Sequence, residues 1–285
     1  MSESRRDDTG VFDAAYGRFA DELYAAIRRE AFGEDIGQTS WLTANEQRGF
    51  CSWLDLSSSS ELLEVASGSG GPALFTVEET GCHVVGVDIH EEGVATANTA
   101  ARERGLAERA RFLVVDAREQ LPFDDESFDA VICIDSINHL YDRAAVLADW
   151  RRVLRRDGRL LFTNAVTLTG LARREELIAR SSSMGDFVFT PAGLDERLVR
   201  EAGFADVRVE DVSVNAARIA GAWRDARERR REALDRIEGA EANASMQAML
   251  HATSLLADER RVSRFAYIAR RAGRHAPGGA LRRSC

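Results

Sequence analysis

The chain of 285 residues contains no lysine, and all 38 of its basic residues are arginine. This excludes Schiff-base catalysis by lysine and the phosphate loop that depends on a lysine. Aspartate and glutamate together number 47, so the formal net charge is −9. A negative protein is not attracted to a polyanion, and the composition therefore disfavours a nucleic-acid-binding protein.

Cysteine and long apolar runs are also scarce. Cys51, Cys82, Cys133 and Cys285 lie far apart and form no C-x-x-C pair, which is typical of reduced thiols rather than of disulfides or a zinc site. No apolar run approaches the ~20 residues that cross a bilayer, and the first eight residues lack the apolar core of a signal peptide. We expect a cytoplasmic protein that has no metal ion and no membrane partner.

The chain instead shows short apolar strands that alternate with amphipathic helices, which is typical of a parallel sheet covered by helices. Strands are predicted at 61–65, 84–88, 110–115, 128–134, 159–164, 207–212 and 262–269. Helices are predicted from residue 11 onward and at 44–54, 93–104, 141–154, 171–180 and 191–202. Gly158 is expected to stop the fourth of these helices. A long helical region, 215–258, is expected to break near Gly239.

The most informative segment is 62–73, Leu-Leu-Glu-Val-Ala-Ser-Gly-Ser-Gly-Gly-Pro-Ala. A strand carrying Glu64 leads into a loop of small residues, and a helix follows with Pro72 just inside it. Such a loop lets the backbone approach a ligand, and the free N–H groups of the helix start attract polar or anionic groups. The next strand ends at Asp88, where a nucleotide-binding fold usually holds the ribose hydroxyls.

Four acids lie at the ends of successive predicted strands: Glu64, Asp88, Asp116 and Asp135. Ligands bind beyond the carboxyl ends of the strands in an open α/β sheet. A hard cation needs oxygens that converge on one point, whereas these acids come from separate parallel strands. They are better suited to the hydroxyl, amine and amide donors of an extended ligand.

These motifs resemble class I S-adenosylmethionine-dependent methyltransferases. Residues 64–71, Glu-Val-Ala-Ser-Gly-Ser-Gly-Gly, look like the glycine-rich motif, and Asp88 matches the ribose-binding acid of the family. Residues 115–117 match its adenine-contacting turn, 121–129 the run into its fourth strand, and 153–160 its helix-to-strand signature. The resemblance covers about residues 60–167, and it is closest to small-molecule enzymes of methyltransferase type 11, phosphoethanolamine or glycine/sarcosine type.

The resemblance implies a Rossmann-like fold with seven strands, mainly parallel, an antiparallel last strand, helices on both faces and an N-terminal helical lid. It implies methyl transfer from S-adenosylmethionine, whose sulfonium already activates the methyl, to a nitrogen, oxygen or carbon of a small molecule. Alignment of the reactants then carries most of the catalysis. The cofactor-binding residues implied are Glu64, Ala66, Ser67, Gly68, Gly70, Asp88, Ile89, Asp116, Ala117 and Asp135.

The acceptor site is expected beside the predicted strand that ends near Asp135. His139 follows it in the loop and is a candidate base or orienting group, or a residue that only shapes the pocket. Asn138 and His139, with Gln38 and Trp41 from the loosely matching lid segment 32–43, are the expected substrate-binding residues. For Trp41 a role as a core anchor is equally compatible with the sequence.

One position departs from the family pattern, because Ala66 stands where these enzymes usually carry glycine. A left-handed backbone there costs an alanine on the order of 1 kcal/mol. A degenerate domain that does not bind the cofactor is thus one alternative. A separate alternative function is an S-adenosylmethionine-binding regulator or an inactive partner subunit without catalysis. A nicotinamide-dependent dehydrogenase fits less well, since its third glycine is missing at the required offset.

The expected organisation is a lid or cap at 1–56, a cofactor-binding domain at 57–214, a helical cap at 215–261, the final strand at 262–273 and a disordered tail at 274–285. For the region 215–258, a helix simply packed on the domain is the competing interpretation. The expected partner is a small-molecule substrate, and a homodimer is left open.

Overall fold

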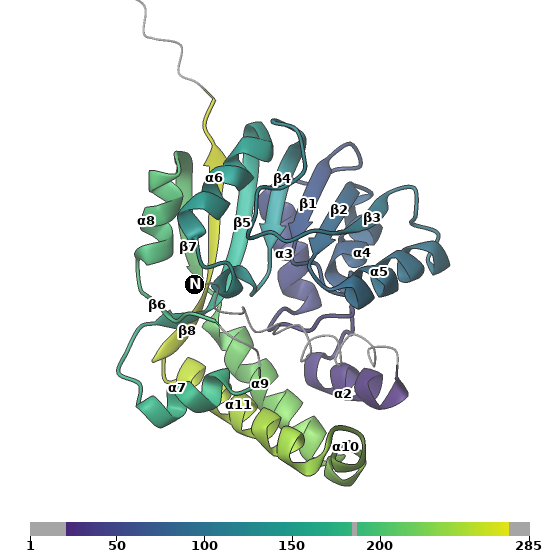
Figure 1. Cartoon of the computed structure of the whole chain (residues 1–285), viewed down its shortest axis with the longest axis vertical. Coiled ribbons are helices and arrows are strands. Elements are labelled where there is room, and N and C mark those ends of the chain that lie inside the picture. Colours follow the sequence, from purple (N-terminus) through teal and green to yellow (C-terminus); the bar gives the residue numbers. More distant parts are fainter. Residues whose placement is uncertain (1–20, 184–186, 274–285) are drawn as a thin grey trace, which may run out of the picture.

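The computed structural model describes residues 21–183 and 187–273, and it is built on one twisted sheet (Figure 1). The main strands run in the order β3-β2-β1-β4-β5-β8-β7, and a short β6 pairs with β5. β1 to β5 are parallel, whereas β8 is antiparallel to both β5 and β7. The strands are β1 (Glu61–Val65), β2 (His83–Asp88), β3 (Ala110–Val114), β4 (Phe128–Cys133), β5 (Leu154–Leu168), β6 (Thr190–Pro191), β7 (Phe204–Asp211) and β8 (Val262–Arg271).

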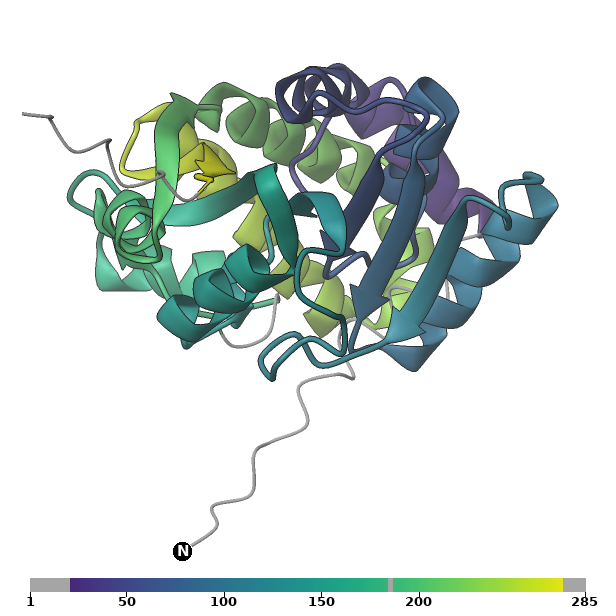
Figure 2. The same ribbon diagram turned by 90° about the horizontal axis from the view of Figure 1, so that it is seen from above.

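Helices cover both faces of the sheet because successive strand residues point to opposite sides (Figure 2). Leu62 packs on one face with α3 (Ala44–Leu54), α4 (Gly71–Thr80) and α5 (Glu91–Glu103). Leu63 packs on the other face with α6 (Arg143–Val153) and α8 (Leu194–Glu201). The mainly apolar strands β1, β2 and β4 are thus buried on both faces, as expected for the centre of a parallel sheet, whereas the edge strand β3 is partly exposed.

A further group of helices lies below the sheet in Figure 1, beyond the carboxyl ends of its central strands. It consists of α2 (Glu22–Phe32), α7 (Arg174–Ser181), α9 (Ser213–Glu228), α10 (Arg231–Glu238) and α11 (Ala240–Asp258). Phe32, Trp41, Ile219 and Leu250 belong to a hydrophobic core that this group shares with the end of β5. The predicted break at Gly239 is present, and a second one separates α9 from α10.

Several predicted boundaries are wrong. β5 begins at Leu154, five residues before its predicted start. Gly158 was expected to stop the preceding helix, but the residue with a left-handed backbone there is Asp157 (φ 62°). Gly158 is needed for space, because a Cβ there would lie 2.8 Å from the Arg155 carbonyl oxygen. The helix predicted from 191 begins at Leu194, because Thr190–Pro191 forms β6, a short strand beside β5 that the sequence analysis did not predict.

Helix α7 begins at Arg174 rather than at 171, and β7 begins three residues before its predicted start. The predicted start of the first helix at residue 11 and the predicted tail lie outside the described residues. No described helix combines the length and the apolar character that a membrane span requires.

Candidate functional site

The strand order places the four predicted acids in a row at the carboxyl edge of the sheet. Because β3, β2, β1 and β4 are adjacent and parallel, the row reads Asp116, Asp88, Glu64 and Asp135. Register supports this arrangement, since Val65 pairs with Val87 on one side and with Cys133 on the other. Acids that come from distant parts of the sequence therefore share one edge.

The loop between β1 and α4 is a tight turn with a left-handed backbone at three positions. Ala66, Gly68 and Gly70 have φ of 58°, 54° and 77°. Ala66 thus adopts the conformation for which alanine is disfavoured by roughly 1–2 kcal/mol. Gly70 is also required for packing, because a Cβ there would lie 2.7 Å from the Cβ of Ala97.

The same loop is fixed to the segment that precedes α3. A Cβ on Gly71 would lie 2.4 Å from the carbonyl oxygen of Ile36 and 2.5 Å from that of Gly37. Only glycine allows this contact, so the segment 33–43 lies directly against the start of α4. The predicted lid segment and the glycine-rich loop are therefore in contact.

Asp88 holds the glycine-rich loop in place. One of its carboxylate oxygens accepts the N–H of Gly68 at 2.7 Å, and the other accepts the N–H of His90 at 3.0 Å. Burial raises the pKa of Asp88, although these backbone donors oppose the shift. A carboxylate has about four acceptor sites, so hydroxyl groups of a ligand still have lone pairs available on Asp88.

Glu64 is only 3% exposed, and its Oε2 atom has no hydrogen-bond partner. Burial, with the negative charge of Asp88 as a second cause, raises the pKa of Glu64 to about 8. The hydroxyl groups of Ser67 and Ser69 are likewise buried without a partner. Buried polar atoms are nearly always paired, so these atoms in and beside the glycine-rich loop fit a polar ligand such as S-adenosylmethionine.

The other predicted cofactor residues lie at the ends of β2 and β3. Asp116 is bound by its neighbour Arg118, whose Nη2 lies 2.7 Å from a carboxylate oxygen. Ala117 packs against the core of the α6 face, and Ile89 is 37% exposed. These residues share the edge with Asp88. Within the described part of the chain, none of them has a buried polar side-chain atom that lacks a hydrogen-bond partner.

Asp135 is engaged by groups of the protein itself. Its Oδ1 accepts from the Thr163 hydroxyl at 2.7 Å and from Nε of Arg264 at 2.8 Å. Its Oδ2 accepts the backbone N–H of Trp41 at 3.1 Å. Asp135 thereby joins β4, β5, β8 and the segment before α3.

The sequence analysis missed Arg264 and Glu46, which complete this network. Arg264 Nη1 lies 2.7 Å from Oε1 of Glu46, and the arginine side chain is 0% exposed. An arginine inside an apolar strand, and the Thr43-x-x-Glu46 spacing of a capping box, were signals in the sequence. Thr43 does cap α3 through the N–H of Glu46, but the Glu46 carboxylate pairs with Arg264 instead.

The two predicted lid residues have different surroundings. Gln38 is buried. Its Oε1 accepts the backbone N–H of Ile36, and its Nε2 donates to the carbonyl oxygen of Glu34, so the side chain stabilises its own turn. Trp41 packs edge-on against Trp223 of α9 at 6.2 Å, within the hydrophobic core of the lower helices. Trp41 is thus a core anchor that also adjoins Asp135.

Asn138 and His139 form a short 3-10 turn, η1 (Ile137–His139), just after Asp135. Asn138 is buried, and its Oδ1 atom has no hydrogen-bond partner. The His139 ring lies edge-on to Phe187 at 6.0 Å, and this histidine makes further contacts. Phe187 and Arg180, which the sequence analysis missed, therefore lie on the same side as the predicted acceptor residues.

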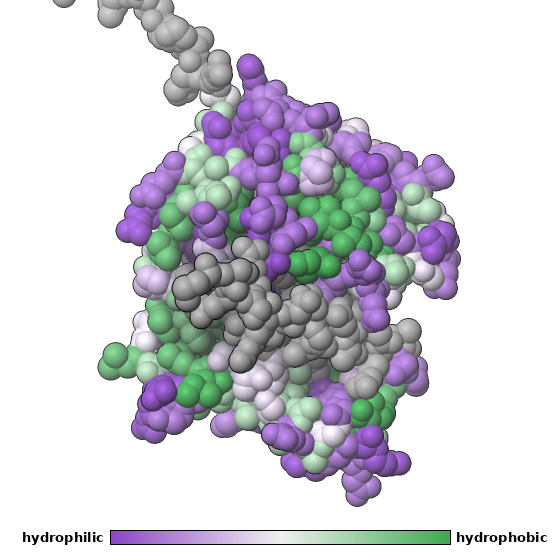
Figure 3. All heavy atoms as spheres, viewed as in Figure 1, coloured by the Kyte–Doolittle hydropathy of each residue, from purple (hydrophilic) through white to green (hydrophobic). Residues whose placement is uncertain are grey.

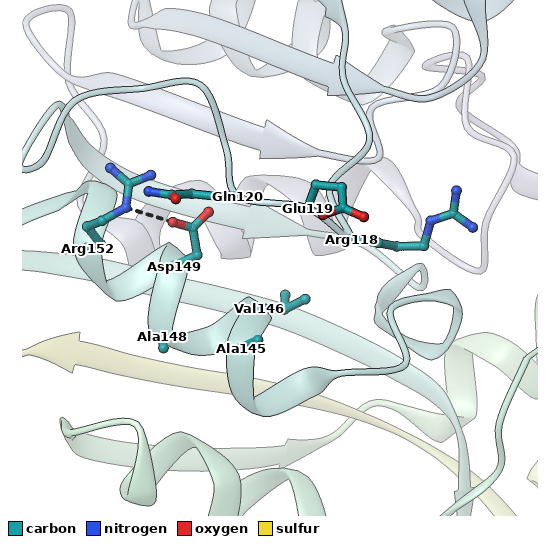
Figure 4. A pocket seen from close by; sticks show the side chains of 8 residues that line it. All are labelled: Arg118, Glu119, Gln120, Ala145, Val146, Ala148, Asp149 and Arg152. Carbon is teal, nitrogen blue, oxygen red and sulfur yellow. Dashed lines mark hydrogen bonds and ion pairs between the residues drawn. The ribbon is translucent and has the colours of Figure 1, made fainter.

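A hollow of about 400 Å³ lies elsewhere, between the loop after β3 and helix α6 (Figure 4). Its lining consists of Arg118, Glu119, Gln120, Ala145, Val146, Ala148, Asp149 and Arg152. Asp149 and Arg152 form an ion pair, and both bond the backbone of Leu121. None of the predicted site residues lines this hollow. Of its charged residues, Asp149 pairs with Arg152, and Arg118 pairs with Asp116 outside the lining.

The face of the molecule drawn in Figure 3, which has the view of Figure 1, carries both polar and hydrophobic residues. Polar residues cover much of it, and hydrophobic residues gather near α7. Leu171, Ile178 and Val188 are exposed in and around that helix. Among the described residues, no group of three or more histidines, cysteines or acids is placed to hold a metal ion.

Known proteins are similar to this chain in sequence. A family described as a methyltransferase domain matches residues 63–162. The 27-O-demethylrifamycin SV methyltransferase of Amycolatopsis mediterranei (strain S699) is 30% identical over 248 residues, which cover 85% of this chain and 90% of that protein. The glycine/sarcosine/dimethylglycine N-methyltransferase of Actinopolyspora halophila is 31% identical, over 63% of this chain and 31% of that protein.

Solved structures agree on the fold. Phosphoethanolamine N-methyltransferase 2 of Haemonchus contortus, in complex with S-adenosyl-L-methionine, superposes with a TM-score of 0.74 at 20% identity, over 95% of this chain and 59% of that one. The [4+2]-cyclase SpnF superposes with a TM-score of 0.74 at 22% identity, over 95% and 98% of the two chains. The fold alone therefore does not define the reaction.

The fold, the glycine-rich loop with its row of acids, and the similarity over most of the chain define an S-adenosylmethionine-dependent methyltransferase of class I. The chain belongs to this family, in its small-molecule branch, and it transfers a methyl group from S-adenosylmethionine to a small-molecule acceptor.

Proposed function

We propose that the cofactor lies along the carboxyl edge of β3, β2, β1 and β4, with the acceptor between this edge and the helices below it. The observation that carries this proposal is the buried, unpartnered Oε2 of Glu64 beside the left-handed turn at Ala66 and Gly68. S-Adenosylmethionine supplies a methyl group that its sulfonium has already activated. The task left to the chain is to bind, orient and shield the two reactants.

Each predicted residue has a proposed part in this task. Glu64 holds its proton near neutral pH in the free protein, ionises beside the cationic amino-acid end of the cofactor and accepts hydrogen bonds from it. Asp88 accepts from the ribose hydroxyls. Asp116, Ala117 and Ile89 flank the adenine. Ala66, Ser67, Gly68 and Gly70 bring the backbone close to the ligand. Asp135, whose oxygens are already bonded to Arg264, Thr163 and Trp41, fixes the loop that carries the acceptor residues.

On the acceptor side, we propose that Asn138 and His139 face the reacting atom. The unpartnered Oδ1 of Asn138 is available to a donor on the acceptor. His139 orients the acceptor or removes its proton, which is the histidine chemistry expected near neutral pH. Trp41 and Gln38 hold the segment before α3 against this pocket. The acceptor atom is a nitrogen, oxygen or carbon.

The helices below the sheet, with the described residues 21–56, act in this proposal as a cap that excludes water. The net charge of −9 and the cap-like helices favour a metabolite over nucleic acid as the acceptor. Cys51, Cys82 and Cys133 are buried free thiols, which suits a cytoplasmic enzyme. A homodimer remains compatible with this arrangement.

Calorimetry with S-adenosylhomocysteine tests the cofactor site, with NAD⁺ as the comparison ligand. We expect S-adenosylhomocysteine to bind and NAD⁺ not to bind. The Glu64→Ala variant should bind S-adenosylhomocysteine at least tenfold more weakly, because a hydrogen bond to a charged group contributes roughly 1.5–3 kcal/mol. Glu61→Ala, on the same strand, serves as the control. Preferential binding of NAD⁺, or unchanged affinity in Glu64→Ala, would refute the assignment.

A further inference from the structure

Five described arginine residues are at most 9% exposed, and one of them differs from the rest. Arg28, Arg143, Arg227 and Arg264 each form an ion pair with a carboxylate. Arg180 is 3% exposed, yet no carboxylate of residues 21–183 or 187–273 lies within ion-pair distance of it. Buried charges are normally paired, so Arg180 needs a separate explanation.

The contacts that Arg180 does make leave most of its donors unused. It lies in the last turn of α7, and its Cζ atom is 5.5 Å from the centre of the Trp41 ring and 5.6 Å from that of Phe187. Its one hydrogen bond goes from Nη2 to the Ala165 carbonyl at 3.4 Å. A guanidinium has five N–H donors, and aromatic faces stabilise its charge without accepting them as an oxygen does.

Nearby charge does not compensate for the burial. Burial lowers the pKa of Arg180 to about 10, and among the described residues Asp135 is the only charged group that opposes the shift. The oxygens of Asp135 already accept from Arg264, Thr163 and Trp41. For Arg264, in contrast, the two carboxylates raise the pKa despite complete burial. Arg180 is therefore a buried cation whose counter-charge is missing from the described chain.

The position of Arg180 connects it with the acceptor site. Trp41 donates its backbone N–H to Asp135, and Phe187 lies against His139. The two rings that lie over the guanidinium thus belong to residues that also touch the loop carrying the acceptor residues. A planar guanidinium matches two oxygens of a carboxylate or phosphate at once.

We propose that Arg180 binds an oxyanion, a carboxylate or a phosphate ester, on the acceptor molecule and so orients the acceptor beside His139. This inference rests on the proposed function of the site. Trp41 and Phe187 exclude water from the ion pair, which strengthens it. The substrate class is accordingly an anionic small molecule with an apolar part that can lie against these rings.

A purely structural role for Arg180 predicts a different effect on stability. If the guanidinium served the fold, its removal would destabilise the free protein as removal of the paired Arg227 should. If its partner is the acceptor, the neutral variant Arg180→Gln should fold with unchanged or higher free energy of unfolding, because it no longer buries an unpaired charge. Urea unfolding of Arg180→Gln and Arg227→Gln without ligand separates the two roles.

The binding experiment uses the enzyme loaded with S-adenosylhomocysteine. A panel of small carboxylates and phosphate monoesters, each matched with its neutral amide or alcohol, is titrated by calorimetry. The wild type should bind anionic members at least tenfold more tightly than their neutral counterparts. Arg180→Gln should lose this preference, whereas Arg174→Gln, an exposed arginine of the same helix, should keep it. Comparison of the two halves of the panel distinguishes a carboxylate from a phosphate.

The proposal is overturned if neutral counterparts bind equally well, if no anion of the panel binds the wild type, or if Arg180→Gln retains the preference. The S-adenosylhomocysteine titration separates this failure from that of the proposed function. Unchanged cofactor affinity without any anion preference would refute only the role of Arg180. Loss of cofactor binding in the wild type itself would refute the proposed site as a whole.

Discussion

Arg264 and Asp135 form a buried ion pair, with Nε 2.8 Å from Oδ1 and exposed side-chain fractions of 0% and 5%. Arg264 comes from β8, near the end of the sequence, and Asp135 from the loop after β4. The same guanidinium reaches Glu46 of α3 at 2.7 Å. One arginine thus connects the sheet, the loop that carries His139 and the helix that follows the predicted lid segment.

Replacing Arg264 by methionine should therefore lower the free energy of unfolding of the protein. The change leaves two buried carboxylates without a counter-charge, and breaking a buried pair costs about 3–5 kcal/mol. Urea unfolding measures the loss. Arg270→Met on the same strand is the matched control, since its pairs with Asp157 and Asp206 are exposed and should contribute about 0–1 kcal/mol. Equal losses in both variants would contradict a special role for Arg264.

The raised pKa of Glu64 predicts a pH-dependent stability. Burial and Asp88 raise this pKa from its usual 4.5 to about 8, so the folded state binds a proton that the unfolded state has released. The stabilising contribution is complete below about pH 4.5 and is lost as pH rises toward about 8. Across this pH range, the free energy of unfolding measured in urea should fall. The fall should be smaller in Glu64→Gln than in the wild type, and it should be the same as in the wild type in Glu61→Gln. An identical slope in wild type and Glu64→Gln would refute the shift.

Asp88→Ala should weaken the binding of S-adenosylmethionine at least tenfold. The variant removes an acceptor for ribose hydroxyls, where a charge-assisted hydrogen bond contributes roughly 1.5–3 kcal/mol. It also releases the N–H of Gly68 and of His90, which loosens the loop. Calorimetry checks the affinity, with the exposed Asp124→Ala as control. Unchanged affinity would remove Asp88 from the cofactor site.

His139→Ala distinguishes a proton-transfer role from a role in shaping the pocket. If His139 acts as a base, kcat should fall by ~10²–10⁴-fold while the affinity for S-adenosylhomocysteine stays nearly constant. His251→Ala, on the exposed side of α11, should leave kcat unchanged. Steady-state kinetics with an identified acceptor gives the answer. A fall of less than tenfold would assign the catalysis to alignment of the reactants alone.

Ala66→Gly should stabilise the protein slightly or leave it unchanged. The left-handed backbone at φ 58° disfavours alanine by roughly 1–2 kcal/mol, but glycine gains unfolded-state entropy that offsets about 0.4–1 kcal/mol. Ala100→Gly, in the regular helix α5, is the control and should destabilise by about 1 kcal/mol. Thermal unfolding that shows equal losses in both variants would indicate that Ala66 is not strained.

The sequence alone predicted those parts of the fold that local patterns specify. β1 and α3 have the predicted limits, 61–65 and 44–54, because an apolar run and a capping threonine mark them. The glycine-rich loop and the acids of the first four strands also follow from local spacing, since parallel strands bring their carboxyl ends to one edge. The limits of β5 and α8 were wrong because pairing between distant segments decides them. Leu154 at the start of β5 pairs with Phe128 of β4, and Thr190–Pro191, just before α8, pairs with the end of β5.

Only the tertiary structure decided which charges are buried and which of them have partners. Arg264 and Glu46 are 218 residues apart, and Arg264 and Asp135 are 129 apart, so local sequence patterns do not show that these charges pair. Arg180 is the only buried residue of α7, and the approach of Trp41, Phe187 and the Ala165 carbonyl from other parts of the chain encloses it. The cost of a buried charge depends on the groups that surround it in space, and these groups come together only when the chain folds.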